Sequence, residues 1–441
     1  MEELHYCLSD TIYALSSGPG KGGVAVIRAS GNQVRNVLKR LAGIENPKPR
    51  HAYFKPIEHN GETLDQALVL FFEAPFSFTG EDVAEFQIHG GRAVIQAVLE
   101  ALGDQSGCRP AERGEFSRRA VINGKMDLTE AEGLLDLIHA ETEQQRAQAL
   151  GQMKGNLGRL YEEWRQNLVH HMAYLEAFID FPEEEIPPEK LSEIDGQVME
   201  LAGKIKSHLD DNRAGERLRE GFQIAIIGAP NVGKSSLINA LTRKDVAIVS
   251  EIAGTTRDIV EAHLDVGGFP VVLADTAGLR ETDGRIESEG IRRAVQKAEE
   301  ADLILSVQDG TRWPKAESLP ETLRHKTVLT VWNKSDLMSG QSKELTVSAK
   351  TGSGIPDLWA EIKSVLERDF AGRGSGLITR ERYRVALKTC LERLQAAVQV
   401  AELELKAEEL RLAARALGRI TGRIDAEDLL DVIFRDFCIG K

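Results

Sequence analysis

The residues whose chemistry is easiest to recognise lie between positions 228 and 235. This stretch, Gly-Ala-Pro-Asn-Val-Gly-Lys-Ser, follows the apolar run 222–227 and matches the phosphate-loop pattern G-x-x-x-x-G-K-S/T. Glycines in such a loop allow backbone N–H groups to surround phosphate oxygens, and the positive end of the following helix adds to the attraction. Lys234 is expected to reach the β- and γ-phosphates, and Ser235 to ligate Mg²⁺. The pattern therefore predicts a nucleoside triphosphate site, against the alternative of a chance glycine turn.

Two further segments offer groups for the metal and for the γ-phosphate. The motif Asp-Thr-Ala-Gly at 275–278 follows the apolar run 269–274, at a strand end where a second carboxylate on the Mg²⁺ side is expected. Gly278 can donate its N–H to the γ-phosphate. The intervening segment 254–258, Gly-Thr-Thr-Arg-Asp, is a source of a switch threonine for Mg²⁺.

Two loops farther along the chain predict recognition of guanine. The motif Asn-Lys-Ser-Asp at 333–336 follows the apolar run 327–332, and a carboxylate there can accept from the ring N–H and the exocyclic amine of guanine. Adenine has no such donor pair and would leave the carboxylate unpaired, which is unfavourable in a buried pocket. The triplet Ser-Ala-Lys at 348–350 suits a loop whose backbone donates to the base carbonyl. The five segments in this order predict a GTPase of the translation-factor-related class.

The hydrolytic step needs a group that the first motifs do not provide. Leu279 stands where Ras-like GTPases carry the glutamine that orients the attacking water, and an apolar side chain cannot do so. Glu287 is the best candidate within the second switch, against the alternative of a solvated glutamate. Arg257 and Arg280 are candidate arginine fingers. Asn231 could hold a monovalent cation that neutralises developing charge, or could simply stabilise the loop turn.

The elements that must position these residues change character along the chain. Residues 1–120 mix short apolar runs with glycines: 22–31 and 66–75 are predicted strands, and 90–102 a helix. Apolar stripes at spacings of three or four then predict long helices on both sides of the prolines in 181–190.

The strand, glycine-loop and helix pattern of a Ras-like α/β module occupies residues 221–370, and helical stripes resume after it. Helical stripes on both flanks need a partner surface. We therefore predict a multidomain α/β and α chain with an α+β domain at 1–120, a helical domain formed by 121–220 and 371–441, and the GTPase inserted at 221–370. The alternative is two separate helical tails.

Composition narrows the class of protein. The 441 residues suggest roughly three domains, and 42% hydrophobic with 28% charged residues excludes wholesale disorder. The net charge of −14 argues against broad nonspecific binding to nucleic acid or anionic lipid. The four cysteines form neither a metal motif nor a disulfide framework, and there is no signal peptide or membrane-spanning run, so a soluble cytoplasmic protein is expected. One local cluster is basic and comprises Arg109, Arg113, Arg118, Arg119 and Lys125. This cluster could contact tRNA or a partner protein, or it could form a face that is solvated or lies beside the folate.

Together these segments resemble the MnmE (TrmE) family of tRNA-modifying GTPases over essentially the whole chain. The GTPase motifs GAPNVGKSSLINAL, AIVSEIAGTTRD and DTAGLRET are shared with several relatives of that family. The terminal CIGK and the N-terminal DTIYAL, GPGKGGVAVIR and FTGEDVAEFQIHGG are far more specific to it.

The resemblance implies a K⁺-stimulated GTPase that acts at the wobble uridine of tRNA. With a flavin-dependent partner, MnmG (GidA), which is expected to carry FAD, the family installs an aminomethyl-type (carboxymethylaminomethyl) group at carbon 5. The GTPase domains of the family pair across a homodimer when GTP and K⁺ are bound, which would replace an external activator. Glu287 matches the water-orienting acid, and Ser235 and Thr256 match the Mg²⁺ ligands. The K⁺ site of the family matches Asn231, Ser250, Ile252 and Thr255.

The resemblance also implies that the first domain binds folate and forms the constitutive dimer. Four charged residues match the family's contacts to a tetrahydrofolate derivative, the one-carbon donor: Arg28, Glu85, Lys125 and Lys441. By residue type alone, each would be a surface charge. Cys438 matches the C-terminal cysteine of the family and, beside cationic Lys441, could serve as nucleophile or proton donor. The alternative is a half-buried cysteine on an apolar stripe.

Motif positions and resemblance together define the expected GTP site. It comprises Asn231, Val232, Gly233, Lys234, Ser235, Ser236, Ser250, Glu251, Ile252, Ala253, Gly254, Thr255, Thr256, Asp275, Thr276, Ala277, Gly278, Asn333, Lys334, Asp336, Ser348, Ala349 and Lys350. Two competing functions are a GTP-dependent ribosome-assembly switch and a folate-dependent transferase. The single GTPase module and the acidic net charge disfavour the switch, and the intact hydrolytic positions disfavour the transferase.

Overall fold

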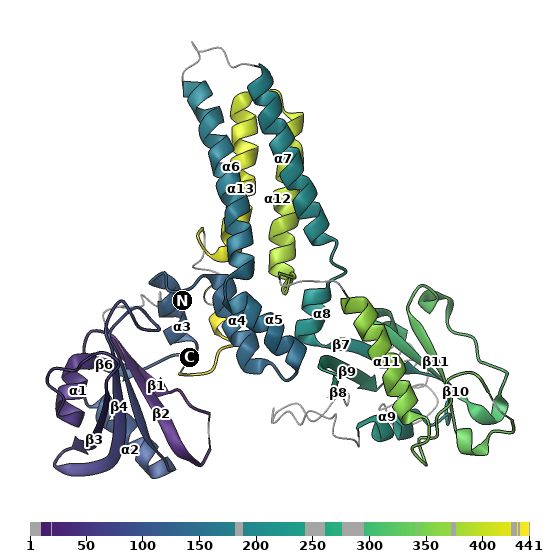
Figure 1. Cartoon of the computed structure of the whole chain (residues 1–441), viewed down its shortest axis with the longest axis horizontal. Coiled ribbons are helices and arrows are strands. Elements are labelled where there is room, and N and C mark those ends of the chain that lie inside the picture. Colours follow the sequence, from purple (N-terminus) through teal and green to yellow (C-terminus); the bar gives the residue numbers. More distant parts are fainter. Residues whose placement is uncertain are drawn as a thin grey trace, which may run out of the picture. The chain divides into compact units, whose positions relative to one another are not determined.

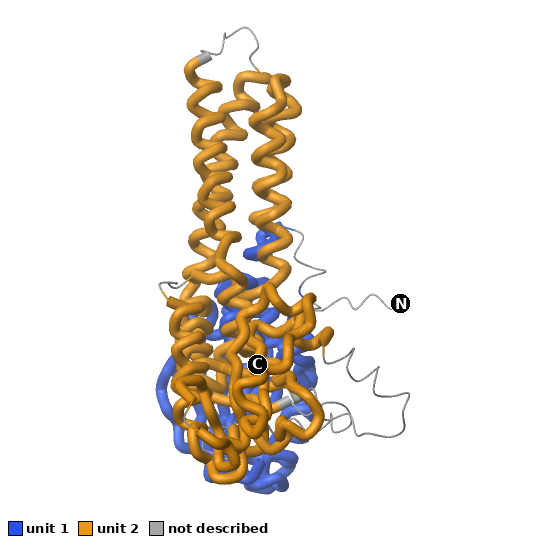
Figure 2. Tube along the Cα trace, turned by 90° about the vertical axis from the view of Figure 1, so that its right-hand side faces the viewer, with its two compact units in different colours: residues 1–135, 418–441 blue, residues 136–417 orange. Residues whose placement is uncertain are grey.

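The computed structural model describes residues 10–18, 20–180, 188–242, 261–275, 295–340, 342–371, 376–424, 430 and 433–440. Two compact units, distinguished in Figure 2, contain residues 1–135 with 418–441, and residues 136–417. The three domain boundaries drawn from the sequence therefore stay a prediction. Among the residues that the structure describes, there is no helical segment with the length and hydropathy of a membrane span.

The first unit contains a six-stranded sheet of order β3-β4-β5-β2-β1-β6 (Figure 1). All neighbouring strands are antiparallel except β1 and β6. The strands are β1 Thr11–Leu15, β2 Gly22–Ser30, β3 Ala52–His59, β4 Glu62–Phe72, β5 Val83–Gly90 and β6 Cys108–Pro110. The helices in this part are α1 Val34–Ala42, α2 Arg92–Gly103, α3 Glu115–Ile122 and α4 Leu128–His139. The strands predicted in 22–31 and 66–75 and the helix predicted at 90–102 are confirmed, with small shifts at their ends.

The two faces of this sheet differ because side chains alternate along each strand. Odd-numbered residues of β2 such as Ile27 join the main apolar core with residues of α1 and α2. The opposite face carries a smaller cluster that includes Ile12, Ala14 and Phe116. The cross-strand register aligns Ala14, Arg28 and Glu85 in one row on that second face. The sheet therefore places two opposite charges beside an aromatic cluster.

The end of the chain also belongs to the first unit. Leu430, Ile433, Phe434 and Phe437 pack with Leu128 and other residues at the start of α4. The predicted apolar stripe at the C-terminus is therefore buried.

Long helices form the next part of the chain. The helices are α5 Glu143–Met153, α6 Asn156–Asp180, α7 Pro188–Leu209, α8 Ala214–Glu220, α12 Glu381–Gln399 and α13 Leu403–Thr421. Apolar residues spaced by three or four along α6, such as Leu157, Trp164 and Leu168, are buried. Helices α7 and α12 pack together although the α/β module separates them in sequence, as Figure 1 shows. The flanking helical segments thus bury each other's stripes, as the sequence predicts.

The α/β module is a five-stranded sheet of order β11-β10-β7-β9-β8, parallel except for the hairpin of β8 and β9. Its strands are β7 Phe222–Ile227, β8 Glu261–Val266, β9 Phe269–Asp275, β10 Leu303–Asp309 and β11 Val328–Asn333. Its described helices include α9 Lys234–Thr242 and α11 Ile355–Phe370, and residues 295–300 are also helical. Short 3₁₀ turns are η1 Gly310–Arg312, η2 Glu321–Leu323 and η3 Ser335–Leu337. The carboxyl ends of the parallel strands meet at one edge, which is where open α/β sheets bind ligands.

Candidate functional site

The phosphate loop leaves the end of β7 and enters α9 at Lys234. Gly233 has a φ of +94°, and a Cβ there would lie 2.4 Å from Nδ2 of Asn333, so only glycine fits. Ser235 and Ser236 are exposed in the first turn of α9, where backbone N–H groups have no partner within the helix. The loop therefore presents donors and two hydroxyl groups at the positive end of a helix, which suits a phosphate with its metal.

The lysine of this loop lies across it. Lys234 Nζ donates to the carbonyl oxygens of Gly228 at 2.8 Å and Ala229 at 2.9 Å. Asn231 adopts a left-handed φ of +64° and is exposed. Asn231 is thus accessible to a ligand at the loop and Lys234 is half-buried, while Val232 is buried and anchors the loop in the core.

Asn333 joins the phosphate loop to the base-recognition loop. Its Nδ2 donates to the carbonyl of Val232 at 2.8 Å, and its Oδ1 accepts from the backbone N–H of Ala349 at 3.1 Å. The residue is 2% exposed, so these bonds are shielded from water. Asn333 therefore connects the two loops structurally.

Asp336 is the residue that the sequence predicts to read a base. It is exposed, and its Oδ1 accepts from Ser348 Oγ at 2.6 Å, which fixes the carboxylate. The backbone N–H of Thr351 donates to the same Ser348 hydroxyl at 3.2 Å. Two of the predicted motifs, 333–336 and 348–350, are thus brought together by hydrogen bonds. An oriented, accessible carboxylate is suited to the donor edge of guanine.

Asp309 belongs to this edge although the sequence motifs do not include it. It ends β10 beside Asn333, and its Oδ2 accepts from Lys334 Nζ at 2.8 Å. Burial alone would raise the pKa of Asp309, but the bonds from Lys334 and Thr311 lower it to about 2. An acidic residue at the end of the buried strand 303–309 is the sequence signal that could have identified it.

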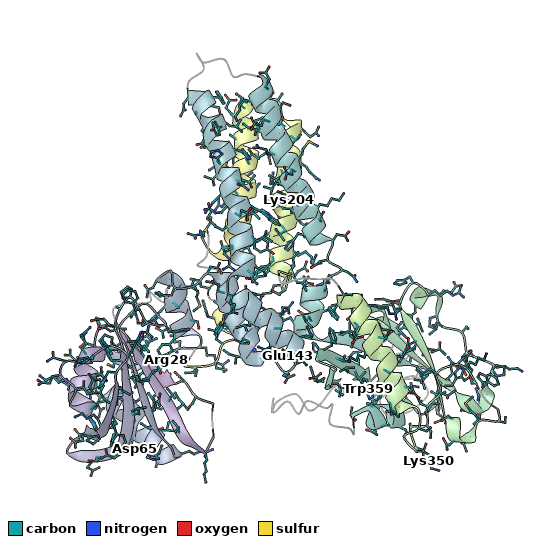
Figure 3. The ribbon with its side chains drawn as sticks, in the orientation of Figure 1. Arg28, Asp65, Glu143, Lys204, Lys350 and Trp359 are labelled. Atoms are coloured by element: carbon teal, nitrogen blue, oxygen red, sulfur yellow. The ribbon has the colours of Figure 1, made fainter. Side chains whose placement is uncertain are left out.

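A second candidate site lies on the sheet of the first unit. Arg28, labelled in Figure 3, donates to Glu85 Oε1 through Nη2 at 2.8 Å and Nε at 3.0 Å. The guanidinium carbon of Arg28 lies 5.1 Å from the ring centroid of Phe78 and 5.7 Å from that of Phe116. Lys125 Nζ donates to the carbonyl of Pro75 at 2.8 Å, in the loop that carries Phe78. The structure thus gathers Arg28, Glu85 and Lys125 around one loop.

The C-terminal residues reach the same sheet. Ile439 forms an isolated bridge with Arg113, and the carbonyl of Gly440 accepts from Ser16 Oγ at 2.8 Å, next to the end of β1. A Cβ on Gly440, whose φ is +99°, would lie 2.1 Å from the carbonyl oxygen of Leu15. Cys438 is exposed, so the alternative of a half-buried cysteine is wrong.

Two members of the basic cluster, Arg109 and Arg119, belong to an ion-pair network, whereas Arg113 and Lys125 are exposed. Arg119 is 2% exposed and pairs with Glu115 at 3.0 Å and Glu81 at 3.1 Å, and Arg109 pairs with Glu115 at 2.6 Å. Burial would raise the pKa of Glu115, but hydrogen bonds and the charge of Arg109 lower it. The prediction of a solvated or tRNA-contacting face is therefore wrong for Arg119, because buried carboxylates already neutralise it.

Several predicted site residues lie outside the described residues. They are Ser250, Glu251, Ile252, Ala253, Gly254, Thr255, Thr256, Thr276, Ala277, Gly278, Glu287 and Lys441, together with Arg257, Leu279 and Arg280. Asp275 ends β9, and its backbone alone is described. Lys350 lies in the loop before α11 and is labelled in Figure 3.

Comparisons with known proteins match this chain along nearly its whole length. The family model described as the MnmE helical domain matches residues 128–438, and that of the GTP-binding protein TrmE N-terminus matches residues 11–125. The tRNA modification GTPase MnmE of Paramagnetospirillum magneticum is 52% identical, over 98% of this chain and 100% of that protein. The mitochondrial subunit GTPB3 of the 5-taurinomethyluridine tRNA synthase of Danio rerio is 48% identical, over 98% of this chain and 93% of that protein.

A solved structure overlaps with a smaller part of the chain. The Era protein of Aquifex aeolicus, as a variant bound to GDP and aluminium fluoride, is 27% identical and covers 41% of this chain and 68% of its own, with a TM-score of 0.27.

Proposed function

We propose that this chain, which belongs to the MnmE family of tRNA modification GTPases, hydrolyses GTP in the course of modifying the wobble uridine of tRNA. That it is a GTPase taking part in tRNA modification follows from that membership. The name of the Danio rerio relative contains a uridine substituted at carbon 5. That name supports carbon 5 as the modified position, and membership of the MnmE family is the ground on which we propose a substituent of the carboxymethylaminomethyl type.

One observation supports the choice of GTP most directly. Asn333 ties the phosphate loop at Val232 to Ala349, and Ser348 orients the exposed carboxylate of Asp336. A phosphate-binding loop and a carboxylate aimed at a base are thus parts of one hydrogen-bonded assembly. A guanine nucleotide satisfies both, whereas adenine would leave the carboxylate without donors.

We propose roles in GTP hydrolysis first for residues that the structure describes and then for residues outside the described part of the chain. Lys234 binds the β- and γ-phosphates, and Ser235, exposed at the start of α9, has the hard oxygen donor that Mg²⁺ prefers. Thr256 would complete the protein ligands of Mg²⁺, with Asp275 on the same side. Glu287 would orient the attacking water.

We further propose a K⁺ ion beside the phosphates and pairing of GTPase domains in a homodimer. The exposed Asn231 offers an amide oxygen at the loop, which fits K⁺, and Ser250, Ile252 and Thr255 would add oxygen ligands. A cation at this place would supply the positive charge that an arginine finger supplies in other GTPases. Domain pairing would then replace an external activator.

The second candidate site suits a tetrahydrofolate derivative, which supplies a one-carbon unit when bound. Glu85 takes both bonds from Arg28 on Oε1, so its carboxylate can still accept donors of a pterin at Oε2. Arg28, Lys125 and Lys441 would bind carboxylates of the glutamate tail. Exposed Cys438, two residues before the Gly440 whose carbonyl accepts from Ser16 after β1, would serve as nucleophile or proton donor. The flavin for this chemistry would be FAD on an MnmG (GidA) partner.

Nucleoside analysis of tRNA tests the proposed function. Cells that lack this chain should lose the substituent at carbon 5 of the wobble uridine, and the intact gene should restore it. The Asp336→Asn variant should fail to restore it, because it lacks the base carboxylate. A normal set of wobble nucleosides together with accumulated ribosomal precursors would support the ribosome-assembly alternative instead.

A further inference from the structure

Asp309 lies next to the base-recognition motif without belonging to it. Strands β10 and β11 run parallel with Asp309 opposite Asn333. Oδ2 of Asp309 accepts from Lys334 Nζ at 2.8 Å, in an ion pair whose side chains are 15% and 31% exposed. Because Lys334 begins the loop that ends in Asp336, a group that holds Lys334 also holds the start of that loop.

The carboxylate of Asp309 is fixed from its other side as well. Its Oδ1 accepts from the backbone N–H of Thr311 at 3.0 Å and from Thr311 Oγ1 at 2.7 Å, which caps η1. Since its pKa is lowered to about 2, the carboxylate is ionised at neutral pH. The bond to Lys334 is therefore charge-assisted, which makes it stronger than a bond between neutral groups.

The backbone at Lys334 needs such support. Its φ is +64°, in the left-handed region that residues other than glycine adopt at a cost. The segment after β10 packs closely here, since a Cβ on Gly310 would lie 2.5 Å from the carbonyl oxygen of Asn333 and 2.8 Å from Met338 Cγ. The loops carrying Asp309 and Asp336 thus form one packed unit with the ion pair between them.

We propose that Asp309 is a positioning residue for guanine recognition, acting through Lys334 to hold the loop that presents Asp336 to the base. The inference rests on the proposed function, because it assumes that a guanine nucleotide is the ligand. Loss of this hold should weaken GDP and GTP binding alike. It should also reduce the preference for GDP over IDP, because inosine lacks the exocyclic amine that a well-placed Asp336 would bind.

The experiment measures binding of GDP and IDP by the full-length chain carrying Asp309→Asn, which keeps the size of the side chain and removes its charge. We expect the Kd for GDP to rise about tenfold, the Kd for IDP to rise less, and KM for GTP to rise with kcat at saturation unchanged. Glu317→Gln is the matched control, because Glu317 pairs with the exposed Arg312 at 3.2 Å in the same region. It should leave binding unchanged.

Two further variants separate positioning from a general loss of folding. Asp309→Glu keeps the charge and should recover part of the lost affinity. In a Lys334→Met background, adding Asp309→Asn should cause no further loss, because the two residues act as one unit. The proposal would be overturned if Asp309→Asn weakened GDP binding as much in the Lys334→Met background as in the wild-type chain. It would also be overturned if Asp309→Asn alone kept the wild-type affinity for GDP and the wild-type ratio of GDP affinity to IDP affinity. Failure of the wild-type chain to bind GDP would instead refute the proposed function, and this inference with it.

Discussion

The side-chain amide of Asn333 donates to the carbonyl of Val232 at 2.8 Å, across 101 residues of sequence. The same amide accepts from the backbone N–H of Ala349 at 3.1 Å. One buried side chain thus connects the loop that would bind phosphates with the loop that would bind the base. Affinity at either end of the nucleotide should consequently depend on Asn333.

Asn333→Asp should weaken nucleotide binding. A carboxylate cannot donate to the carbonyl of Val232 and would repel it in a buried place, at a cost of about 2 kcal/mol, or roughly thirtyfold in GDP affinity. Titration with a fluorescent GDP analogue measures the change. Asn239→Asp, on the exposed side of α9, is the control and should bind normally. Normal affinity in Asn333→Asp would show that the connection is unimportant.

Asp336→Asn should change the base preference. An amide can donate to the extra carbonyl of xanthine, whereas it cannot accept both donors of guanine. GTP turnover at low substrate should fall about a hundredfold, and XTP turnover should rise. Competition between GTP and XTP in one hydrolysis assay measures both turnover rates. The control is Glu361→Gln, which changes an exposed residue of α11. An unchanged preference for GTP would remove Asp336 from base recognition.

Substitution of Asn231 tests the proposed K⁺ site. GTP hydrolysis should be much faster in K⁺ than in Na⁺, and Asn231→Ala should lose most of that difference. Because Asn231 has a φ of +64°, alanine also introduces backbone strain.

Asn231→Gly separates these two causes, since glycine accepts this φ and still lacks the amide oxygen. If the amide binds K⁺, both variants should lose the difference between the salts. A K⁺ response retained by Asn231→Gly would indicate that the asparagine only shapes the loop. Equal wild-type rates in the two salts would contradict the cation argument altogether.

Glu287→Ala should slow hydrolysis while leaving GTP binding nearly normal, because a water-orienting group acts on the chemical step. Single-turnover hydrolysis and equilibrium binding should be measured on the same preparation. Turnover at the wild-type rate would mean that Glu287 is a solvated glutamate.

Arg28→Ala should weaken binding of a tetrahydrofolate about tenfold without changing the GTPase rate, because it removes a cation and the two hydrogen bonds that hold Glu85 Oε1. Calorimetric titration measures the affinity. The control is Arg35→Ala, which removes an exposed arginine that pairs with Glu73 and Asp82 in the same domain. Equal affinity in wild type and Arg28→Ala would exclude Arg28 from the folate site.

Local sequence was sufficient to predict the phosphate loop and the base-recognition motif. These sites are built from neighbouring residues at fixed spacing, and the apolar runs 222–227 and 327–332 place each motif at the end of a strand. Apolar stripes were likewise sufficient to predict the long helices and their buried faces, because an apolar stripe at helical spacing must be buried. The sequence alone thus determined which residues form the candidate nucleotide site and which helical faces are buried.

Tertiary structure decided which of these residues bond to one another. The register of β2 and β5 pairs Arg28 with Glu85, and that of β10 and β11 brings Asp309 to Lys334. Arg119 belongs to a basic run in the sequence, yet its partner Glu81 comes from a distant segment. Such pairings depend on strand register and on contacts across long separations, and no local spacing encodes either, so charge and residue type alone could not predict them.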